Sequence, residues 1–287
     1  AIAFQYSDPL MIHLGNLNLI AVLSWLPWVF AAYALAIERR RLAWAGAAGV
    51  LFALANYAGH AQSSLYVGLA LVVYTALRLA AASSRREAAR QAVPALFVVL
   101  GLAALLSAPI LLPAVELAGY TARSEFVYQD TVGYSLAPAQ AIGLLTPGFF
   151  GRGPALHWGL WDRVETPYAG VAAILLAAAA LLLASGRVRR ELWPWVGLGL
   201  FGFVTALGVY AVVHGWLTVL LPGFDQFRAP ARALALWTFA VATLGAVGVD
   251  LAARRSGAVE PGDASARPAL FDAMLRTGAL ILFGVVL

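Results

Sequence analysis

Long apolar stretches, each about the length of a membrane-spanning helix, constrain this chain more than any other feature of its sequence. The run from Leu42 to Ala82 is interrupted by a short polar segment, residues 58–63 (AGHAQS). As one helix this run would be about 60 Å long, roughly twice the thickness of the hydrocarbon core of a bilayer. The run must therefore turn back on itself, and we expect the turn at Gly59-His60.

The composition fits a membrane-embedded chain and excludes a soluble domain. Of the 287 residues, 62% are hydrophobic and 11% are charged, and the mean hydropathy is +0.82. Because a bilayer core holds no water for unpaired backbone groups, apolar stretches of about 20 residues indicate helices. The sequence therefore predicts an all-α fold, a polytopic transmembrane helix bundle. It contains no cysteine, which excludes disulfides and thiolate metal sites.

The apolar stretches predict about eight spans in a single transmembrane domain that covers residues 1–287. The spans are expected near residues 17–37, 42–58, 62–82, 92–117, 168–185, 192–213, 231–252 and 269–287. The chain opens on AIAFQYSDPL, without a methionine or a basic segment, and closes on the apolar ALILFGVVL. We therefore expect an internal piece of a longer protein whose N- and C-terminal parts are missing.

Arginine placement predicts the orientation of the bundle, because cytoplasmic loops are enriched in arginine and lysine. All 19 basic residues are arginines, and thirteen of them, counting Arg78, lie at every second connection. These arginine islands are residues 38–41, 83–90, 186–191 and 253–267. We expect the islands to be cytoplasmic, with 253–267 as a linker loop, and the arginine-poor loop 118–167 to lie outside. All four histidines fall on the arginine-poor side.

The outer loop 118–167 contains a segment with helix signals, residues 135–146. Ser135 is a candidate N-cap, and a Pro-Gly pair follows the segment. An apolar stripe is formed by Leu136, Ala141, Leu144 and Leu145. We expect a short interfacial helix that lies on the membrane surface.

His60 and Gln62 give the AGHAQS segment its polarity. They either hydrate a tight helical turn at the headgroup level or line a cavity on the outer face, since polar side chains that face a bundle are costly unless they are used. In the second case we expect them to face Arg228 and Arg232 and, as neutral donors, to give hydrogen bonds to a bound phosphate. A metal site is not supported, because His60 has no histidine or carboxylate at ligand spacing. No cofactor is evident, and the sequence offers no ligand set for a divalent cation.

The segment FDQFRAPARAL carries two arginines, Arg228 and Arg232, at the start of an outer helix. Four residues apart, they can share one helix face and point at a phosphate, and Pro230 suits the first turn of that helix. The positive end of the helix dipole adds to the attraction. The alternative is that these arginines snorkel to lipid headgroups or pair with Asp225.

Other charged residues of the outer side are candidates for the same site. Arg123 could add to a phosphate-binding set, and Glu116, Glu125 and Asp162 are candidate acidic contributors. Taken alone, each of them is better interpreted as a solvated surface charge. No catalytic residue can be named from these residues.

Several motifs together resemble those of a known family. They are WLPWVFAAYALAIERRR, NYAGHAQSSLY, SAPILLPAVELAGYTARS, SLAPAQAIGLLTPGFFG, TPYAGVAAILLA and FRAPARALAL. Their order, and above all GHAQ, TPGFFG and FRAPAR, is similar to that in bacterial YfhO-like membrane proteins. These are large polytopic proteins of the GT-C glycosyltransferase class.

The resemblance implies a protein of the bacterial cytoplasmic (inner) membrane that transfers a sugar from a polyprenyl-phosphate donor to an acceptor on the outer face. Such transfer needs a carboxylate base and positive groups at the leaving phosphate, for which Arg228 and Arg232 are suited. In the GT-C class the carboxylate usually lies in the first outer loop, and we expect this piece to begin after that loop.

Two other classes remain open. A non-catalytic structural or accessory subunit of a membrane protein complex needs only lipid-matched helices and outer loops that grip other subunits. A transporter is less favoured, because it should carry ionisable residues near mid-membrane, and these are nearly absent. The expected partners are the lipid bilayer, a lipid-linked sugar donor or other membrane subunits, and no nucleic acid.

Overall fold

The structure, a computed structural model, describes residues 2–151 and 165–255. Every regular element in these two ranges is helical, as the sequence predicts. The long helices are α3 (Leu17–Arg39), α4 (Leu42–Tyr57), α5 (Ala61–Ala81), α6 (Arg85–Ala118), α8 (Val171–Leu183), α9 (Gly186–Ala206) and α11 (Leu234–Arg255). The shorter ones are α1 (Ile2–Gln5), α2 (Asp8–Met11), α7 (Tyr128–Thr131) and α10 (Val212–Leu220), with 3₁₀ turns η1 (Ala122–Glu125), η2 (Pro138–Leu144), η3 (Gly208–Tyr210), η4 (Phe224–Gln226) and η5 (Pro230–Ala233).

The helices are apolar enough to indicate a membrane protein. Four of the described segments are long and apolar enough to cross a bilayer: Leu17–Arg39, Ala61–Ala81, Arg85–Ala118 and Pro230–Arg255. The apolar helices α4 and α8 are shorter. The predicted stretch 192–213 is displaced, since α9 begins at Gly186 and ends at Ala206, and the stretch 269–287 lies outside the described residues. The total of eight spans stays a prediction.

The turn between α4 and α5 lies where the sequence predicts it. α4 ends at Tyr57 and α5 begins at Ala61. Gly59 reverses the chain in the left-handed region, at φ +80°. His60 then caps α5, because its Nδ1 accepts a hydrogen bond from the backbone N–H of Ser63 at 3.1 Å.

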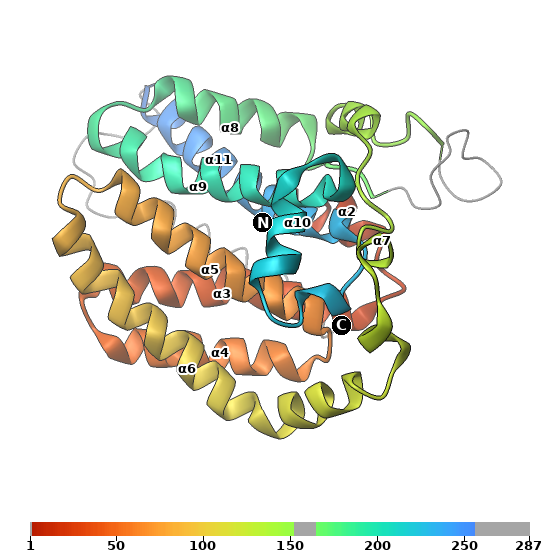
Figure 1. Cartoon of the computed structure of the whole chain (residues 1–287). Coiled ribbons are helices and arrows are strands. Elements are labelled where there is room, and N and C mark those ends of the chain that lie inside the picture. Colours follow the sequence, from red (N-terminus) through yellow and green to blue (C-terminus); the bar gives the residue numbers. More distant parts are fainter. Residues whose placement is uncertain (1, 152–164, 256–287) are drawn as a thin grey trace.

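The longest helix, α6, changes direction in its second half (Figure 1). Its 34 residues would span about 50 Å if straight, more than a hydrocarbon core. Pro94, Pro109 and Pro113 lie inside it, and each removes a backbone donor. Proline is the usual cause of such a bend.

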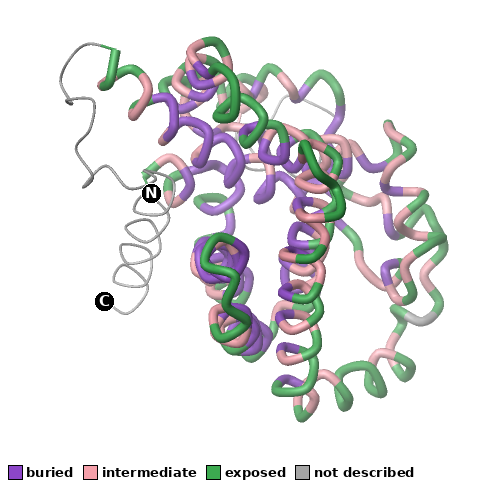
Figure 2. The backbone as a smooth tube through the Cα atoms, turned by 90° about the vertical axis from the view of Figure 1, so that its left-hand side faces the viewer, coloured by how far each residue is buried: buried purple, intermediate pink, exposed green. Residues whose placement is uncertain are grey.

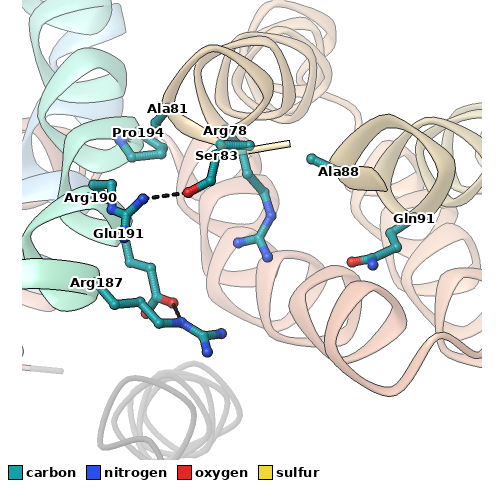
Figure 3. A pocket seen from close by; sticks show the side chains of 10 residues that line it. Arg78, Ala81, Ser83, Ala88, Gln91, Arg187, Arg190, Glu191 and Pro194 are labelled. Atoms are coloured by element: carbon teal, nitrogen blue, oxygen red, sulfur yellow. Dashed lines mark hydrogen bonds and ion pairs between the residues drawn. The ribbon is translucent and has the colours of Figure 1, made fainter. Parts of the chain in front are cut away.

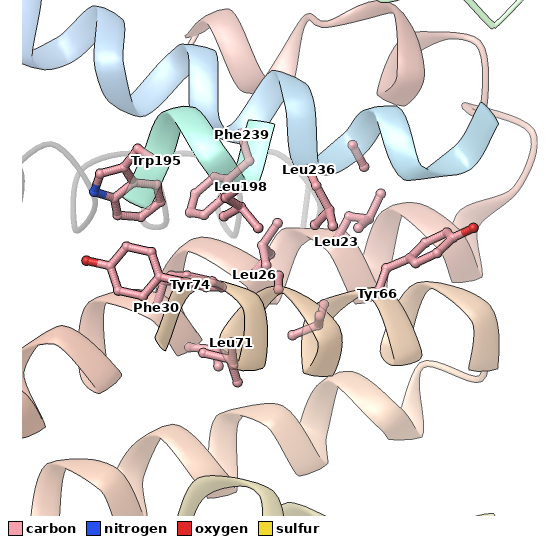
Figure 4. Close-up of a cluster of buried hydrophobic side chains, with 14 of the residues drawn as sticks. Leu23, Leu26, Phe30, Tyr66, Leu71, Tyr74, Trp195, Leu198, Leu236 and Phe239 are labelled. Atoms are coloured by element: carbon pink, nitrogen blue, oxygen red, sulfur yellow. The ribbon is translucent and has the colours of Figure 1, made fainter. Parts of the chain in front are cut away.

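Aromatic side chains from four helices meet in the core. Phe30 of α3, Tyr74 of α5, Trp195 of α9 and Phe239 of α11 have ring centroids 4.8 to 5.7 Å apart in the pairs they form (Figure 4). Their rings are tilted or edge to face, which suits the charge distribution of aromatic rings. Figure 2 shows the buried residues on the faces that the helices turn toward one another.

Small residues let α8 and α11 approach closely. A Cβ on Gly248 would collide with the carbonyl oxygen of Leu176, and one on Gly245 would lie 3.2 Å from the carbonyl oxygen of Ala173. Helices in lipid associate through such close packing, because lipid tails are as apolar as the side chains they replace.

The described parts of the arginine islands gather at one end of the bundle, which we call the arginine-rich end (Figure 1). They are not all loops, since α6 begins at Arg85 and α9 at Gly186, so that the arginines occupy first helical turns. Polar contacts join the islands: Arg40 with Glu87 (3.0 Å), Arg190 with Ser83, and Arg255 with the Leu183 carbonyl (3.2 Å). Whether this end faces the cytoplasm stays a prediction.

Single cysteines test the orientation, because the chain has none of its own. Ser185→Cys lies exposed at the arginine-rich end and Ala139→Cys lies exposed in η2 at the opposite end. With intact cells and a membrane-impermeant maleimide, we expect labelling of Ala139→Cys, and of Ser185→Cys only after permeabilisation. If only Ser185→Cys is labelled in intact cells, the orientation is the opposite of the predicted one.

Candidate functional site

At the arginine-poor end, opposite the arginine islands, the side chain of Gln62 joins α5 to the start of α11. Its Nε2 donates to the carbonyl oxygen of Arg228 at 2.7 Å, and its Oε1 accepts from Arg232 Nη1 at 2.7 Å. Gln62 is buried, with 5% of its surface exposed. The motifs GHAQ and FRAPAR, far apart in the sequence, therefore lie together, as the sequence predicts.

A left-handed residue shapes the arginine segment. Ala229 has φ +63°, and its N–H donates to the carbonyl oxygen of Gly133 at 3.0 Å. Pro230 then begins η5, in agreement with its predicted place in a first turn. Because Arg228 precedes this turn, Arg228 and Arg232 do not share a helix face, and that part of the prediction is wrong.

The two arginines consequently have different environments. Arg228 is exposed, with its guanidinium carbon 5.9 Å from the centre of the Tyr134 ring. Arg232 is half-buried against Gln62. Neither forms an ion pair with Asp225 in the described part of the chain, so the predicted alternative of such pairing is not what the structure contains.

Gln62 holds this segment through both of its amide atoms. The Nε2 that binds the Arg228 carbonyl also lies 3.4 Å from the Ala229 carbonyl oxygen and 3.3 Å from Tyr66 Oη. An amide NH₂ group has two hydrogens, and these contacts use them. Gln62 is therefore a positioning residue for Arg232, and not the donor to a ligand that the sequence predicts.

His60 is a neutral hydrogen-bond donor at this end. Its Nδ1 accepts from Ser63, so the ring proton is on Nε2, which has no hydrogen-bond partner among the described residues. Burial, together with the charges of Arg232, His13 and Arg123, lowers the pKa of His60 from 6.5 to about 4. The ring therefore stays uncharged near pH 7 and can donate from Nε2.

The other predicted site residues lie around this centre or outside the described residues. Arg123 is exposed, and its Nη1 donates to the carbonyl oxygen of Gln226 at 3.4 Å. Glu116, near the end of α6, and Glu125, in η1, are exposed. Asp162 lies outside the described residues. The arginines converge on the segment before α11, and no contact ties Glu116 or Glu125 to it in the described ranges.

The segment 135–146 is helical, but it differs from the prediction in its cap and its packing. The 3₁₀ turn η2 follows Ala137, whose N–H donates to Gln140 Oε1 at 2.9 Å, and Ser135 Oγ instead accepts from the Val209 N–H at 3.1 Å. A Cβ on Gly143 would lie 2.7 Å from the Cβ of Thr166, so η2 packs against the segment after the outer loop. Its place at a membrane surface stays a prediction.

A buried polar cluster that the sequence did not reveal lies near the site. His13 Nδ1 donates to the Pro9 carbonyl oxygen at 2.8 Å, and its Nε2 lies 2.9 Å from Glu165 Oε1. With Nδ1 protonated, the pair is either imidazolium and carboxylate or neutral imidazole and carboxylic acid. Asp8 Oδ2 accepts from the Thr166 N–H at 2.8 Å. Asp8, His13 and Glu165 are at most 5% exposed.

Only part of this cluster has a sequence signal. Ser7, Asp8 and Pro9 form a typical helix start, and α2 begins there. The pairing of His13 with Glu165 has no such signal, because it depends on how the chain returns after the outer loop. No group of three histidine, cysteine, aspartate or glutamate side chains within residues 2–151 and 165–255 is arranged to hold a metal ion.

Comparisons with protein-family models, with curated proteins and with solved structures found no match to this chain.

The two histidines with lowered pKa make the stability of the fold sensitive to mild acid. Burial lowers the pKa of His214 in α10 to about 4, as it does for His60. Between about pH 6.5 and 4 the unfolded chain takes up protons that the folded chain does not, so stability is complete above pH 6.5 and falls as the pH drops through this window. We expect the thermal midpoint in a neutral detergent to fall accordingly.

The variant His214→Leu tests the contribution of one of these histidines to the pH dependence of stability. His214 is 2% exposed and its ring lies edge to face with Phe224, at 5.3 Å. Removing it should make the fall in the midpoint between pH 6.5 and 4 shallower than in the wild type. A pH profile parallel to that of the wild type would contradict the assignment.

Proposed function

We propose that the arginine-poor end binds the phosphate of a polyprenyl-phosphate-linked sugar, and that the protein is a GT-C-type glycosyltransferase of the bacterial inner membrane. The observation that supports this is the contact between Gln62 and Arg232, which fixes a half-buried guanidinium beside the neutral ring of His60. A positioned cation and a neutral donor suit a phosphate that carries a sugar.

Three arginines lie on or against one short segment, residues 226–232. Arg123 donates to the first residue of this segment, Arg228 lies exposed within it, and Arg232 ends it. Guanidinium groups are planar and bind phosphate oxygens in pairs. In our proposal the exposed Arg123 and Arg228 attract the phosphate at the membrane surface, and the half-buried Arg232 binds it. Gln62 is in our proposal a positioning residue, because its own amide atoms are used.

In the proposed reaction, the hydroxyl oxygen of the acceptor bonds to C1 of the sugar while the C1–O bond to the phosphate breaks. The electron pair of that bond leaves with the phosphate, where Arg228 and Arg232 stabilise the charge. The hydroxyl proton passes to a carboxylate base, which the resemblance to the GT-C class places in the first outer loop of such proteins. His60 Nε2 donates to a phosphate or sugar oxygen without adding charge.

Two arginine variants test the phosphate role. Arg228→Ala removes an exposed charge but keeps the backbone carbonyl that Gln62 binds, so the fold should be unaffected. Arg232→Ala should lower sugar transfer about tenfold or more, since losing a hydrogen bond to a charged group costs roughly 1.5 to 3 kcal/mol. The measurement is incorporation of sugar from a polyprenyl-linked donor into membrane glycan by the full-length protein.

Arg86→Ala is the matched control, because Arg86 is exposed at the other end of the bundle and has no polar contact with the described residues. It should leave transfer unchanged. If the double variant Arg228→Ala, Arg232→Ala transfers sugar as well as the wild type, these arginines do not bind the phosphate. If the full-length protein transfers sugar from no such donor, the structural-subunit alternative is favoured.

A further inference from the structure

A polar pocket lies at the arginine-rich end, separated from Gln62 by the length of α5, about 30 Å. Its volume is about 360 Å³, and it is an open pocket lined by the end of α5 and the starts of α6 and α9. Its polar lining consists of Arg78, Ser83, Gln91, Arg187, Arg190 and Glu191 (Figure 3). Because it shares no residue with the site above, its function does not rest on the proposed glycosyl transfer.

The pocket carries more positive charge than its own carboxylate balances. Three guanidinium groups face one carboxylate, that of Glu191, which pairs with Arg187 at 2.8 Å. Arg190 donates to Ser83 Oγ, a neutral acceptor. Neither Arg78 nor Arg190 forms an ion pair with a carboxylate in residues 2–151 and 165–255. Two cations from two helices therefore face this pocket without an anion of the described chain.

The neighbouring carboxylate on α6 does not change this balance. Glu87 lies one turn before Gln91 and accepts from Gln91 Nε2 at 2.7 Å. It also pairs with Arg40, at 3.0 Å, so the charge of Glu87 is balanced outside the pocket. Gln91 is thus held in place in the lining of the pocket, on the side away from Arg190 (Figure 3).

The geometry points to a binding site for a phosphate group in this pocket, with Arg78 and Arg190 as its ligands. A guanidinium offers paired N–H donors that match phosphate oxygens. Three alanines, Ala81, Ala82 and Ala88, line the remaining wall and leave room. The volume is within the usual range of small-ligand pockets, about 300 to 1,000 Å³.

The position of the pocket favours an anionic lipid headgroup as the source of the phosphate. Arg78 lies in the last turn of α5 and Arg190 near the start of α9, at the level where apolar helices end. Basic pockets between helices at this level bind the headgroups of anionic lipids such as cardiolipin. A soluble phosphate compound would meet the same two guanidinium groups, so the test separates the two sources.

The experiment is a ligand titration of the thermal midpoint, with the purified chain in a neutral detergent. Cardiolipin, phosphatidylcholine and inorganic phosphate are added separately to the wild type and to Arg78→Gln, Arg190→Gln and Arg189→Gln. Arg189 is the matched control, since it lies on the same helix and is exposed but does not line the pocket. We expect cardiolipin to raise the midpoint of the wild type and of Arg189→Gln in a saturable way.

Each pocket variant should need about tenfold more cardiolipin for the same shift, because it loses a charged hydrogen bond to phosphate. Arg78→Gln and Arg190→Gln are tested separately, so that one of them still tests the site if the other does not fold. Equal shifts in Arg78→Gln and Arg189→Gln, or an equal effect of phosphatidylcholine, would overturn the site. Inorganic phosphate could also raise the midpoint as much as cardiolipin does, in a way that depends on Arg78 and Arg190. This result would support a phosphate site and contradict a lipid headgroup as the source of the phosphate.

Discussion

The side-chain amide of Gln62 is the interaction on which the arginine-poor end of this protein depends. Between η4 and η5 the chain leaves the helical conformation, and among the described residues no backbone N–H donates to the carbonyl group of Arg228, whereas that of Ala229 accepts from the Arg232 N–H at 3.2 Å. Buried carbonyl groups need donors, and Gln62 supplies one while it accepts from Arg232. The buried amide of Gln62 thus contacts the backbone at the left-handed Ala229, joins α5 to the start of α11, and positions the guanidinium of Arg232.

The two ends of α5 use positive charge in different ways. At its start, the half-buried Arg232 is held by Gln62, and the buried pair of His13 and Glu165 lies close enough for His13 to influence the pKa of His60. At its end, Arg78 faces a pocket together with arginines of α9. A long apolar core separates the two ends, so the two anion sites that we propose do not depend on each other.

Much of the fold could be predicted because it follows from length and periodicity, whereas the local geometry of the site could not. The sequence predicts the turn at Gly59, since an apolar run longer than a bilayer must turn. The polar and charged residues of GHAQ and FRAPAR, both on the arginine-poor side, predict that these motifs meet. The left-handed conformation of Ala229 could not be predicted, because alanine rarely adopts it. As a result Arg228 lies before the helical turn and not within it. The pairing of His13 with Glu165 is a long-range contact that no local pattern encodes. Arginines of the islands 83–90 and 186–191 lie in first helical turns, and Arg39, Arg254 and Arg255 lie in last turns, because arginine is a good helix former.

The most direct test of the central claim is a double-mutant cycle on Gln62 and Arg232. The free energy of unfolding is measured in mixed micelles for the wild type, Gln62→Ala, Arg232→Ala and the double variant. If Gln62 positions Arg232, the two substitutions should couple by about 0.5 to 3 kcal/mol, because residues in one hydrogen-bond network are not additive. Additive losses, within about 0.3 to 0.5 kcal/mol, would show that the two side chains act independently and would contradict the account.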